Sequence, residues 1–197
     1  MKTLKTIPGY APLFAAAFPG DKDPITYDNM ARAIGAFERT LVTPAPFDAF
    51  LAGDDTALTD AQKEGLVTFM DAGCTACHSG AYVGGSMYQK AGLVNAWPNQ
   101  EDKGRSKITG NAADDMMFKV PSLRNIEKTG PYFHDGSVAD LDVAITMMGH
   151  HQLGKELGKE DVAKIHTFLG ALTGPLPTIP PPTLPESGPK TPKPDPS

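Results

Sequence analysis

Both cysteines of the chain lie in one short run, Gly73-Cys74-Thr75-Ala76-Cys77-His78, and this C-x-x-C-H spacing constrains the fold more than any other feature. Two thiols three positions apart lie on the same face of a helical turn. C-x-x-C-H is the attachment sequence for a c-type haem: each thiol forms a thioether with one vinyl group, and the histidine can ligate the iron. The motif therefore predicts a fold built around a covalent haem held by Cys74, Cys77 and His78.

Other uses of the two cysteines explain the pattern less well. A structural zinc ion needs four ligands, and the chain has no second C-x-x-C. A thioredoxin-like redox pair belongs in a βαβ unit, whereas the flanks of Cys74 do not have the pattern of strands. Cysteines at i and i+3 of a helix are poorly placed for a structural disulfide. The haem interpretation is favoured, and a zinc-binding structural module, completed by two of the remaining histidines, stays as an alternative.

Composition indicates a modest globular domain and excludes two classes of partner. The chain has 197 residues, of which 40% are hydrophobic, and a formal net charge of -5. It contains no basic run and no interleaving of aromatic and basic residues, which argues against nucleic acid as a partner. No apolar stretch approaches the length needed to span a membrane.

The two ends of the chain differ from its middle. Residues 1–5 resemble the charged start of a secretory leader, but Pro8-Gly9 and Pro19-Gly20 interrupt the apolar stretch, so we interpret the N-terminus as mature sequence. Because c-type haem is attached outside the cytoplasm, we expect a fragment of a longer, periplasmic protein. Proline dominates residues 175–197, which predicts an extended or disordered, solvated tail rather than a docking motif.

Between these ends, apolar residues recur at helical spacing. Thr26 can cap one helix, and Thr59 with Gln62 forms a capping box for a second helix that leads into Cys74. The apolar stripe of the first helix comprises Met30, Ile34, Phe37 and Leu41. Pro44 and Pro46 should end that helix.

Two further helices are predicted near the C-terminal end. One begins near Ser137 or Asp140, and the other spans about residues 160–172. We predict no strand. The segment from Gly80 to Pro131 has the composition of loops with short helices. A loop region of this length inside a compact domain usually surrounds a bound group, and a haem would be such a group.

This arrangement resembles a type I cytochrome c, and several motifs narrow the resemblance to the bacterial di-haem cytochrome c peroxidases. These motifs are Phe37–Leu41, Gly73–Gly80 with Gly84-Gly85, Phe118–Asn125, Thr129–Gly136, Gln152–Gly154 and Phe168–Gly174. They cover nearly everything before the proline-rich tail. The resemblance implies an all-α fold, with a cytochrome c-like domain over residues 59–174 whose long loops wrap a covalent haem.

The number of haem motifs separates this chain from the whole enzymes. The family has two haem domains, each with its own C-x-x-C-H, whereas this chain has one, and its motifs match the C-terminal, electron-entry domain. The missing N-terminal domain would hold the haem that reduces hydrogen peroxide, and residues 1–58 would link to it. The resemblance thus implies a domain that accepts electrons from a small cytochrome c or a cupredoxin, with a homodimer left open. A stand-alone mono-haem electron carrier is the alternative.

The resemblance also implies the roles of individual residues. His78 and Met148 would be the two axial ligands, with Met147 as the rival of Met148, since a thioether ligand favours reduced iron. A related group of enzymes that oxidise a protein substrate has tyrosine at this position, and the methionine counts against that group. Arg124 and Arg105 are suited to pair with the haem propionates, although a surface role is equally open for Arg105.

The loop around His134 has further implied roles. His134 would act at the interface with the missing domain or in gating. The backbone carbonyls of Thr129 and Pro131 would bind a calcium ion shared with that domain. No residue of this chain is assigned a catalytic role, because the peroxidatic haem lies in the missing part. His150, His151 and His166 are expected to face solvent or to satisfy helix ends.

Overall fold

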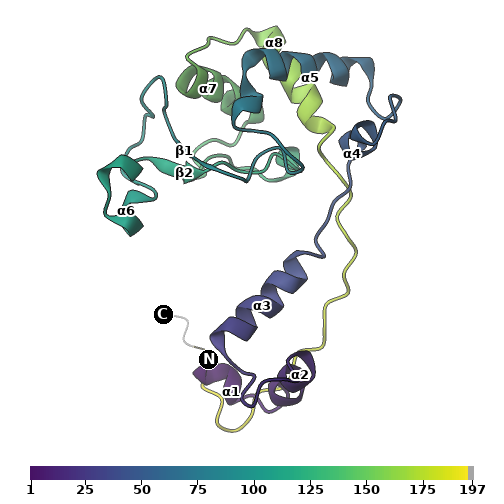
Figure 1. The fold of residues 1–197 in the computed structure, drawn as a ribbon, viewed down its shortest axis with the longest axis vertical. Coiled ribbons are helices and arrows are strands. Elements are labelled where there is room, and N and C mark those ends of the chain that lie inside the picture. Colours follow the sequence, from purple (N-terminus) through teal and green to yellow (C-terminus); the bar gives the residue numbers. More distant parts are fainter. Residues whose placement is uncertain (195–197) are drawn as a thin grey trace. The chain divides into compact units, whose positions relative to one another are not determined.

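A computed structural model describes residues 1–194 of the chain, and its contacts divide the chain into two compact units (Figure 1). The first unit comprises Met1–Val42 together with the chain from Leu176 onward, and the second comprises Thr43–Pro175. The last three residues of the predicted proline-rich tail, 195–197, lie outside the described residues.

The first unit contains three helices in its described part, and the predicted start of one of them is confirmed. The helices are α1 (Lys2–Lys5), α2 (Tyr10–Ala17) and α3 (Tyr27–Glu38). The side-chain oxygen of Thr26 accepts a hydrogen bond from the Asn29 N–H at 3.1 Å, which caps α3. Within this unit the apolar stripe of α3 stays open to solvent, because Ile34 and Phe37 are 51% and 52% exposed.

The described part of the proline-rich tail forms no helix or strand and lies against the N-terminal residues. A Cβ added to Gly9 would meet the Pro185 side chain at 2.6 Å. The Thr191 hydroxyl donates to the Thr6 carbonyl oxygen at 3.1 Å. These contacts hold the 185–191 part of the tail in the first unit.

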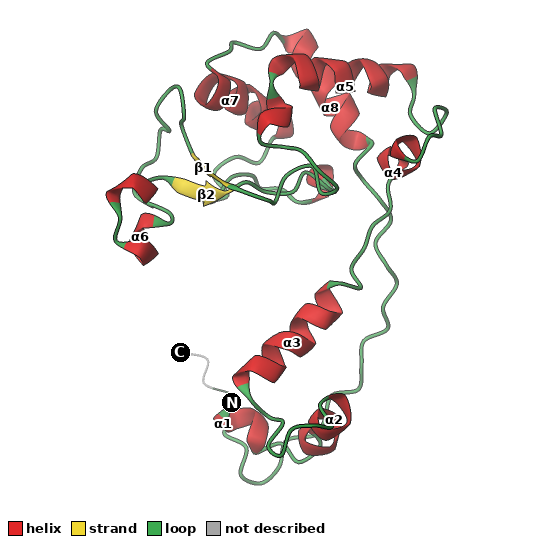
Figure 2. Ribbon diagram, viewed as in Figure 1, coloured by secondary structure: helices red, strands yellow, loops and turns green. Residues whose placement is uncertain are grey.

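The second unit is rich in helix and has little strand, which agrees with the all-α expectation (Figure 2). Its helices are α4 (Pro46–Leu51), α5 (Asp60–Ala72), α6 (Ser106–Thr109), α7 (Leu141–Leu153) and α8 (Lys159–Gly170). Short 3₁₀ turns are η1 (Cys74–Ala76), η2 (Ala112–Asp114) and η3 (Ile126–Lys128). No helix within residues 1–194 has the length and apolar composition to cross a membrane.

The prediction that the 80–131 segment contains no strand was wrong. Strand β1 (Tyr88–Lys90) pairs antiparallel with β2 (Met117–Lys119). Each strand is three residues long, which is too short for an alternating apolar pattern to be recognised in the sequence. The pairing depends on contacts between segments far apart in the chain.

The predicted helix starts in the second unit are confirmed. Thr59 and Gln62 form the capping box of α5, in which the Gln62 N–H donates to Thr59 Oγ1 at 3.2 Å and the Thr59 N–H donates to Gln62 Oε1 at 3.0 Å. Asp140 caps α7 by accepting from the Val143 N–H at 3.0 Å. Local side-chain chemistry was sufficient to locate these two ends.

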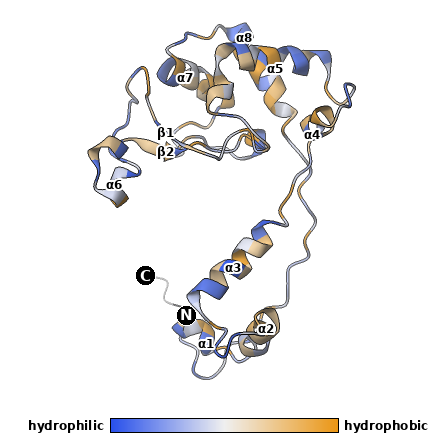
Figure 3. Cartoon of the chain, in the orientation of Figure 1, coloured by the Kyte–Doolittle hydropathy of each residue, from blue (hydrophilic) through white to orange (hydrophobic). Residues whose placement is uncertain are grey.

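The core of the second unit forms where α5 and α8 cross. Phe168, Ile165 and Leu172 are its most deeply buried large side chains. The Phe168 ring on α8 lies 5.3 Å from the Phe69 ring on α5, measured between centroids. Figure 3 shows α8 changing from hydrophilic at its N-terminal end to hydrophobic toward its C-terminal end, where it enters this core.

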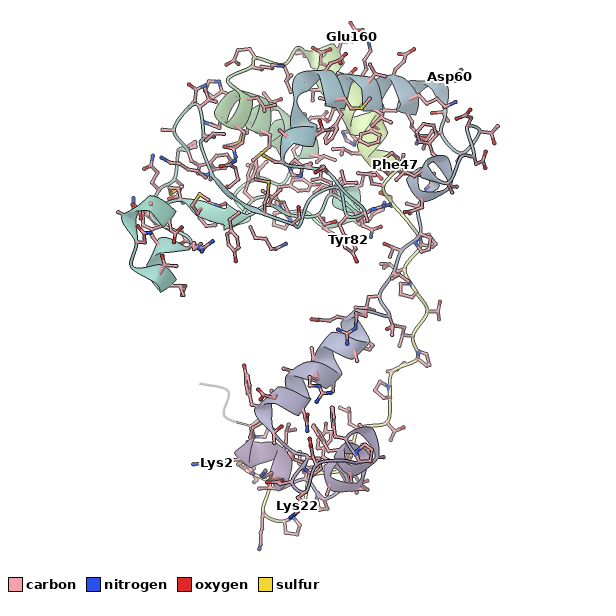
Figure 4. All side chains as sticks on the ribbon, in the orientation of Figure 1. Lys2, Lys22, Phe47, Asp60, Tyr82 and Glu160 are labelled. Atoms are coloured by element: carbon pink, nitrogen blue, oxygen red, sulfur yellow. The ribbon has the colours of Figure 1, made fainter. Side chains whose placement is uncertain are left out.

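Residues 43–58 belong to the second unit. Phe47 of α4 is 8% exposed, and its ring lies 5.4 Å from that of Phe168 (Figure 4 labels Phe47). The Phe47 N–H donates to the Ala171 carbonyl oxygen at 3.1 Å. The boundary between the two units lies between Val42 and Thr43, and the contacts of Phe47 with α8 hold the chain after it in the second unit.

Gly65 of α5 is required by the close approach of α8. A Cβ at this position would lie 2.1 Å from the Lys164 carbonyl oxygen and 2.9 Å from Phe168 Cβ. We expect Gly65→Ala to lower the free energy of unfolding by about 3 kcal/mol, because the backbones must separate. Chemical denaturation measures this change. Gly35→Ala in α3 is the control, since its Cβ would meet only Arg39 Nη1 at 3.6 Å; equal effects of the two variants would contradict the packing argument.

Candidate functional site

A cavity of about 400 Å³ lies within the second unit. Its walls come from the end of α5 and η1, from the loops that follow β2, and from one face each of α7 and α8. Most of the lining is apolar. The sequence-predicted site residues that line it are Cys74, Cys77, His78, Thr129, Pro131, His134 and Met148. Residues separated by more than seventy positions thus meet around one space.

The turn after α5 places both cysteines on the cavity wall. Gly73 ends α5 with φ +99, a left-handed conformation that glycine adopts without strain. The chain then forms η1, in which the N–H groups of Cys77 and His78 donate to the Cys74 carbonyl oxygen at 3.2 and 2.9 Å. Residues i and i+3 of a 3₁₀ turn are eclipsed, so the two sulfurs lie on the same side.

Burial favours the neutral forms of both Cys74 and His78. Both cysteines are free and partly buried. Burial raises the pKa of the Cys74 thiol to about 11, an effect that the Lys155 cation partly opposes. Burial lowers the pKa of His78, which favours the neutral imidazole that binds metals.

His78 has one polar atom that the described protein atoms do not satisfy. Its Nδ1 is buried and has no hydrogen-bond partner among the described residues. Buried polar atoms without partners are rare in native proteins. An imidazole at the wall of an apolar cavity, beside two free thiols, fits a c-type haem held by the Cys74–His78 motif.

Helix α7 contributes one face to the cavity. Residues at helical spacing along it line the space: Leu141, Ala144, Ile145, Met148, Gly149 and Gln152. Met147, the rival ligand, is not among the lining residues. Met148 therefore lines the same cavity as His78, whereas Met147 does not, which favours Met148 as the candidate ligand.

Arg124 does not occupy the place that we expected for a propionate partner. Its guanidinium donates to both carboxylate oxygens of Asp48, each at 2.8 Å, and to the Ala81 carbonyl oxygen at 2.7 and 3.1 Å. Arg124 is also absent from the cavity lining. Arg124 ties α4 to the loop after His78, and its donors are largely committed there.

Arg105 also lies away from the cavity lining. Its Nε is 3.4 Å from an Asp114 carboxylate oxygen, and its guanidinium lies 5.0 Å from the centroid of the Tyr88 ring. These contacts favour the surface role that we left open for this residue.

His134 stands on the cavity wall next to an aromatic partner. Its ring stacks on that of Phe118, with centroids 4.0 Å apart and an interplanar angle of 20°. The preceding Phe133 packs edge-on against Trp97, with ring centroids 4.7 Å apart. The 129–134 loop is thus held by aromatic packing from two sides.

The zinc alternative gains no support. Among residues 1–194 no group of three or more His, Cys, Asp or Glu side chains is placed to hold a metal ion. His150 and His151 pack on each other, and His166 pairs with Asp142. A four-ligand site that includes both cysteines is therefore not assembled here.

The structure also shows lining residues to which the sequence analysis assigned no role. Trp97, Phe118 and Gln152 belong to this group. Trp97 lies in a segment whose sequence has no regular pattern, so the sequence carried no signal for it, whereas Phe118 and Gln152 each begin one of the motifs that carry the family resemblance. Gln152 follows Met148 by four positions, which places the two on one face of a helix; that signal was available.

Comparisons with known proteins agree with this geometry. A family model described as di-haem cytochrome c peroxidase matches residues 1–56. The cytochrome c551 peroxidase of Pseudomonas aeruginosa is 47% identical over 98% of this chain and 57% of its own length. That of Nitrosomonas europaea is 45% identical over 98% of the chain and 58% of its own length. The chain thus spans a little over half the length of these relatives.

A solved structure is also similar. It is a MauG-like protein associated with microbial copper homeostasis, with a TM-score of 0.69 and 28% identity, covering 84% of this chain and 59% of the other. The family match ends before the Cys74–His78 motif begins. The match and the motif are therefore separate observations that point to the same kind of protein.

The Asp48–Arg124 pair predicts a pH dependence of stability. Partial burial raises the pKa of Asp48, but the Ala45 N–H and the Arg124 guanidinium together bring it below its ordinary value. The stabilisation from ionised Asp48 is therefore full at neutral pH and is lost as the pH falls through the folded-state pKa, below about pH 4.

We expect Asp48→Asn to cost about 1 kcal/mol at neutral pH, a modest value because water screens a carboxylate that is 43% exposed. The deficit should shrink toward zero in acid. Urea unfolding over a pH series measures it, with Asp55→Asn in an exposed loop as the control. A deficit that stays constant down to the acid range would exclude the ion pair as its source.

Proposed function

We propose that this chain is the electron-accepting haem domain of a bacterial di-haem cytochrome c peroxidase. The observation that carries the proposal is that Cys74, Cys77, His78 and Met148 all line one apolar cavity. The similarity to two cytochrome c551 peroxidases over nearly the whole chain supports it. The family description names two haems, whereas this chain has one C-x-x-C-H, so we assign the second haem to another part of the full-length protein.

The residues of the cavity divide into three roles. Cys74 and Cys77 would hold the haem as thioethers, and His78 and Met148 would ligate its iron. The haem, when bound, supplies reversible one-electron chemistry with a potential that the thioether raises. The apolar wall excludes water, which further shapes the potential. With both axial positions filled by protein, peroxide has no place to bind, so this domain passes electrons on.

The partners follow from that role. A small cytochrome c or a cupredoxin donates electrons, and hydrogen peroxide is the final acceptor at the second haem. Residues 1–42 form part of the connection to that second haem domain, and His134 acts at the interface or in gating. The Thr129 and Pro131 carbonyls hold a calcium ion there. Covalent haem attachment places the protein in the periplasm.

The proposal is tested with the haem-loaded chain and reduced cytochrome c. We expect the chain to accept electrons from the donor yet to turn over hydrogen peroxide poorly, because its iron has no open position. Fast peroxide turnover by the isolated chain would contradict the assignment as the electron-accepting domain. A stand-alone mono-haem carrier would be indicated if the full gene encoded no second C-x-x-C-H.

Replacing the proposed sixth ligand tests the site directly. We expect Met148→Ala to open the iron to cyanide and to lower the reduction potential, because the neutral thioether that favours reduced iron is removed. Absorption spectra with a cyanide titration, together with spectroelectrochemistry, measure both effects. Met147→Ala is the matched control and should behave as the wild type. The reverse outcome would assign ligation to Met147.

A further inference from the structure

Hydrogen bonds join the last turn of α7 to residues 90–97, which we call the crossing segment. The His151 carbonyl oxygen accepts from the N–H groups of Val94 and Asn95 at 3.0 and 3.2 Å. The Asn95 side-chain amide donates to the His150 carbonyl oxygen at 2.8 Å. Carbonyls in the last turn of a helix have no partner within the helix, so the 90–97 segment supplies bonds that water would otherwise make.

Gln152 is the most connected side chain of this junction. Its Oε1 accepts from the N–H groups of Gly92 and Leu93 at 2.7 and 2.9 Å. Its Nε2 donates to the Lys90 carbonyl oxygen at 3.1 Å. One amide group thereby joins the end of β1 and the start of the crossing segment to α7.

Gln152 is also placed to act on the proposed ligand. It follows Met148 by one helical turn, and both side chains line the cavity. At its other end the crossing segment carries Trp97, which is 4% exposed and lines the same cavity. The bonds of Gln152 therefore lie between the helix that carries Met148 and a segment that contributes Ala91 and Trp97 to the cavity wall.

We propose that Gln152 is a positioning residue for the Met148 ligand. Its three hydrogen bonds fix the turn of α7 that presents the thioether, and their loss lets that turn move relative to His78. The inference rests on the proposed function, because it assumes that Met148 ligates the haem iron. Gln152 touches the backbone of residues 90–93 and acts on the iron only through Met148.

The test is a double-mutant cycle on the haem-loaded chain. Gln152→Met keeps length and apolar bulk but removes all three hydrogen bonds. We expect it to raise the affinity of the ferric iron for cyanide about tenfold, corresponding to about 1.4 kcal/mol of lost ligand positioning, and to lower the reduction potential. In the Met148→Ala background the same change should leave cyanide affinity unaltered, because the ligand on which Gln152 acts is gone.

A matched control separates positioning from loss of stability. Asp140→Ala removes the N-cap of the same helix, which costs about 1 kcal/mol, but Asp140 lies two turns before Met148. It should lower the thermal midpoint and leave cyanide affinity unchanged. If Gln152→Met yields no folded haem protein, Gln152→Asn, which keeps the amide but is one methylene shorter, carries the same expectation.

Each outcome bears on one claim. Wild-type cyanide affinity in Gln152→Met, alongside a raised affinity in Met148→Ala, would overturn the role of Gln152 and leave the proposed function intact. An effect of Gln152→Met that persists in the Met148→Ala background would also overturn it, since the residue would then act by another route. No change in Met148→Ala itself would overturn the ligand assignment and the inference with it.

Discussion

The close crossing of α5 and α8 is the contact on which the rest of the second unit depends. Gly65 removes the side chain that would separate the two helices, and the Phe168 ring then packs between Phe69 and Phe47. The same two helices carry the cavity: α5 ends at the Cys74 turn, while Ile165 and Leu169 of α8 belong both to the core and to the cavity lining. The floor of the site is therefore a continuation of the core, and its shape is fixed by the packing that holds the unit together.

The features that sequence reasoning located correctly are those decided by neighbouring residues. Thr26, Thr59 and Asp140 each satisfy orphan N–H groups within three positions of themselves, so the helix starts could be read from local chemistry. The Cys74–His78 motif is likewise local. Its three site residues, Cys74, Cys77 and His78, line one cavity in the structure.

The features that sequence reasoning missed depend on distant contacts. The β1–β2 pair joins residues about thirty positions apart in the chain, and the unit boundary at Val42 is set by Phe47 meeting α8. Arg124 has the chemistry for a propionate, but a carboxylate brought close by α4 takes its guanidinium. Residue type alone could not distinguish Asp48 from a haem carboxylate, because both offer the same bidentate acceptor.

Apolar and polar residues have different roles around the cavity: apolar residues pack the helices together, and polar residues fix the ends of the helices. Apolar contacts are non-directional, so they stabilise the packing of a helix without fixing its exact position along or around its axis. Helix α7 carries its apolar face toward the cavity, yet polar groups fix its ends: Asp140 at the start, Gln152 and then Lys155 at the finish. Lys155 Nζ donates to the Ala72 carbonyl oxygen at 2.9 Å, which links the end of α7 to the end of α5 just before Cys74. If His78 and Met148 bind the haem iron as proposed, both ligands need fixed positions, although His78 follows the turn after α5 and Met148 lies in α7. These directional bonds connect the two segments that carry them.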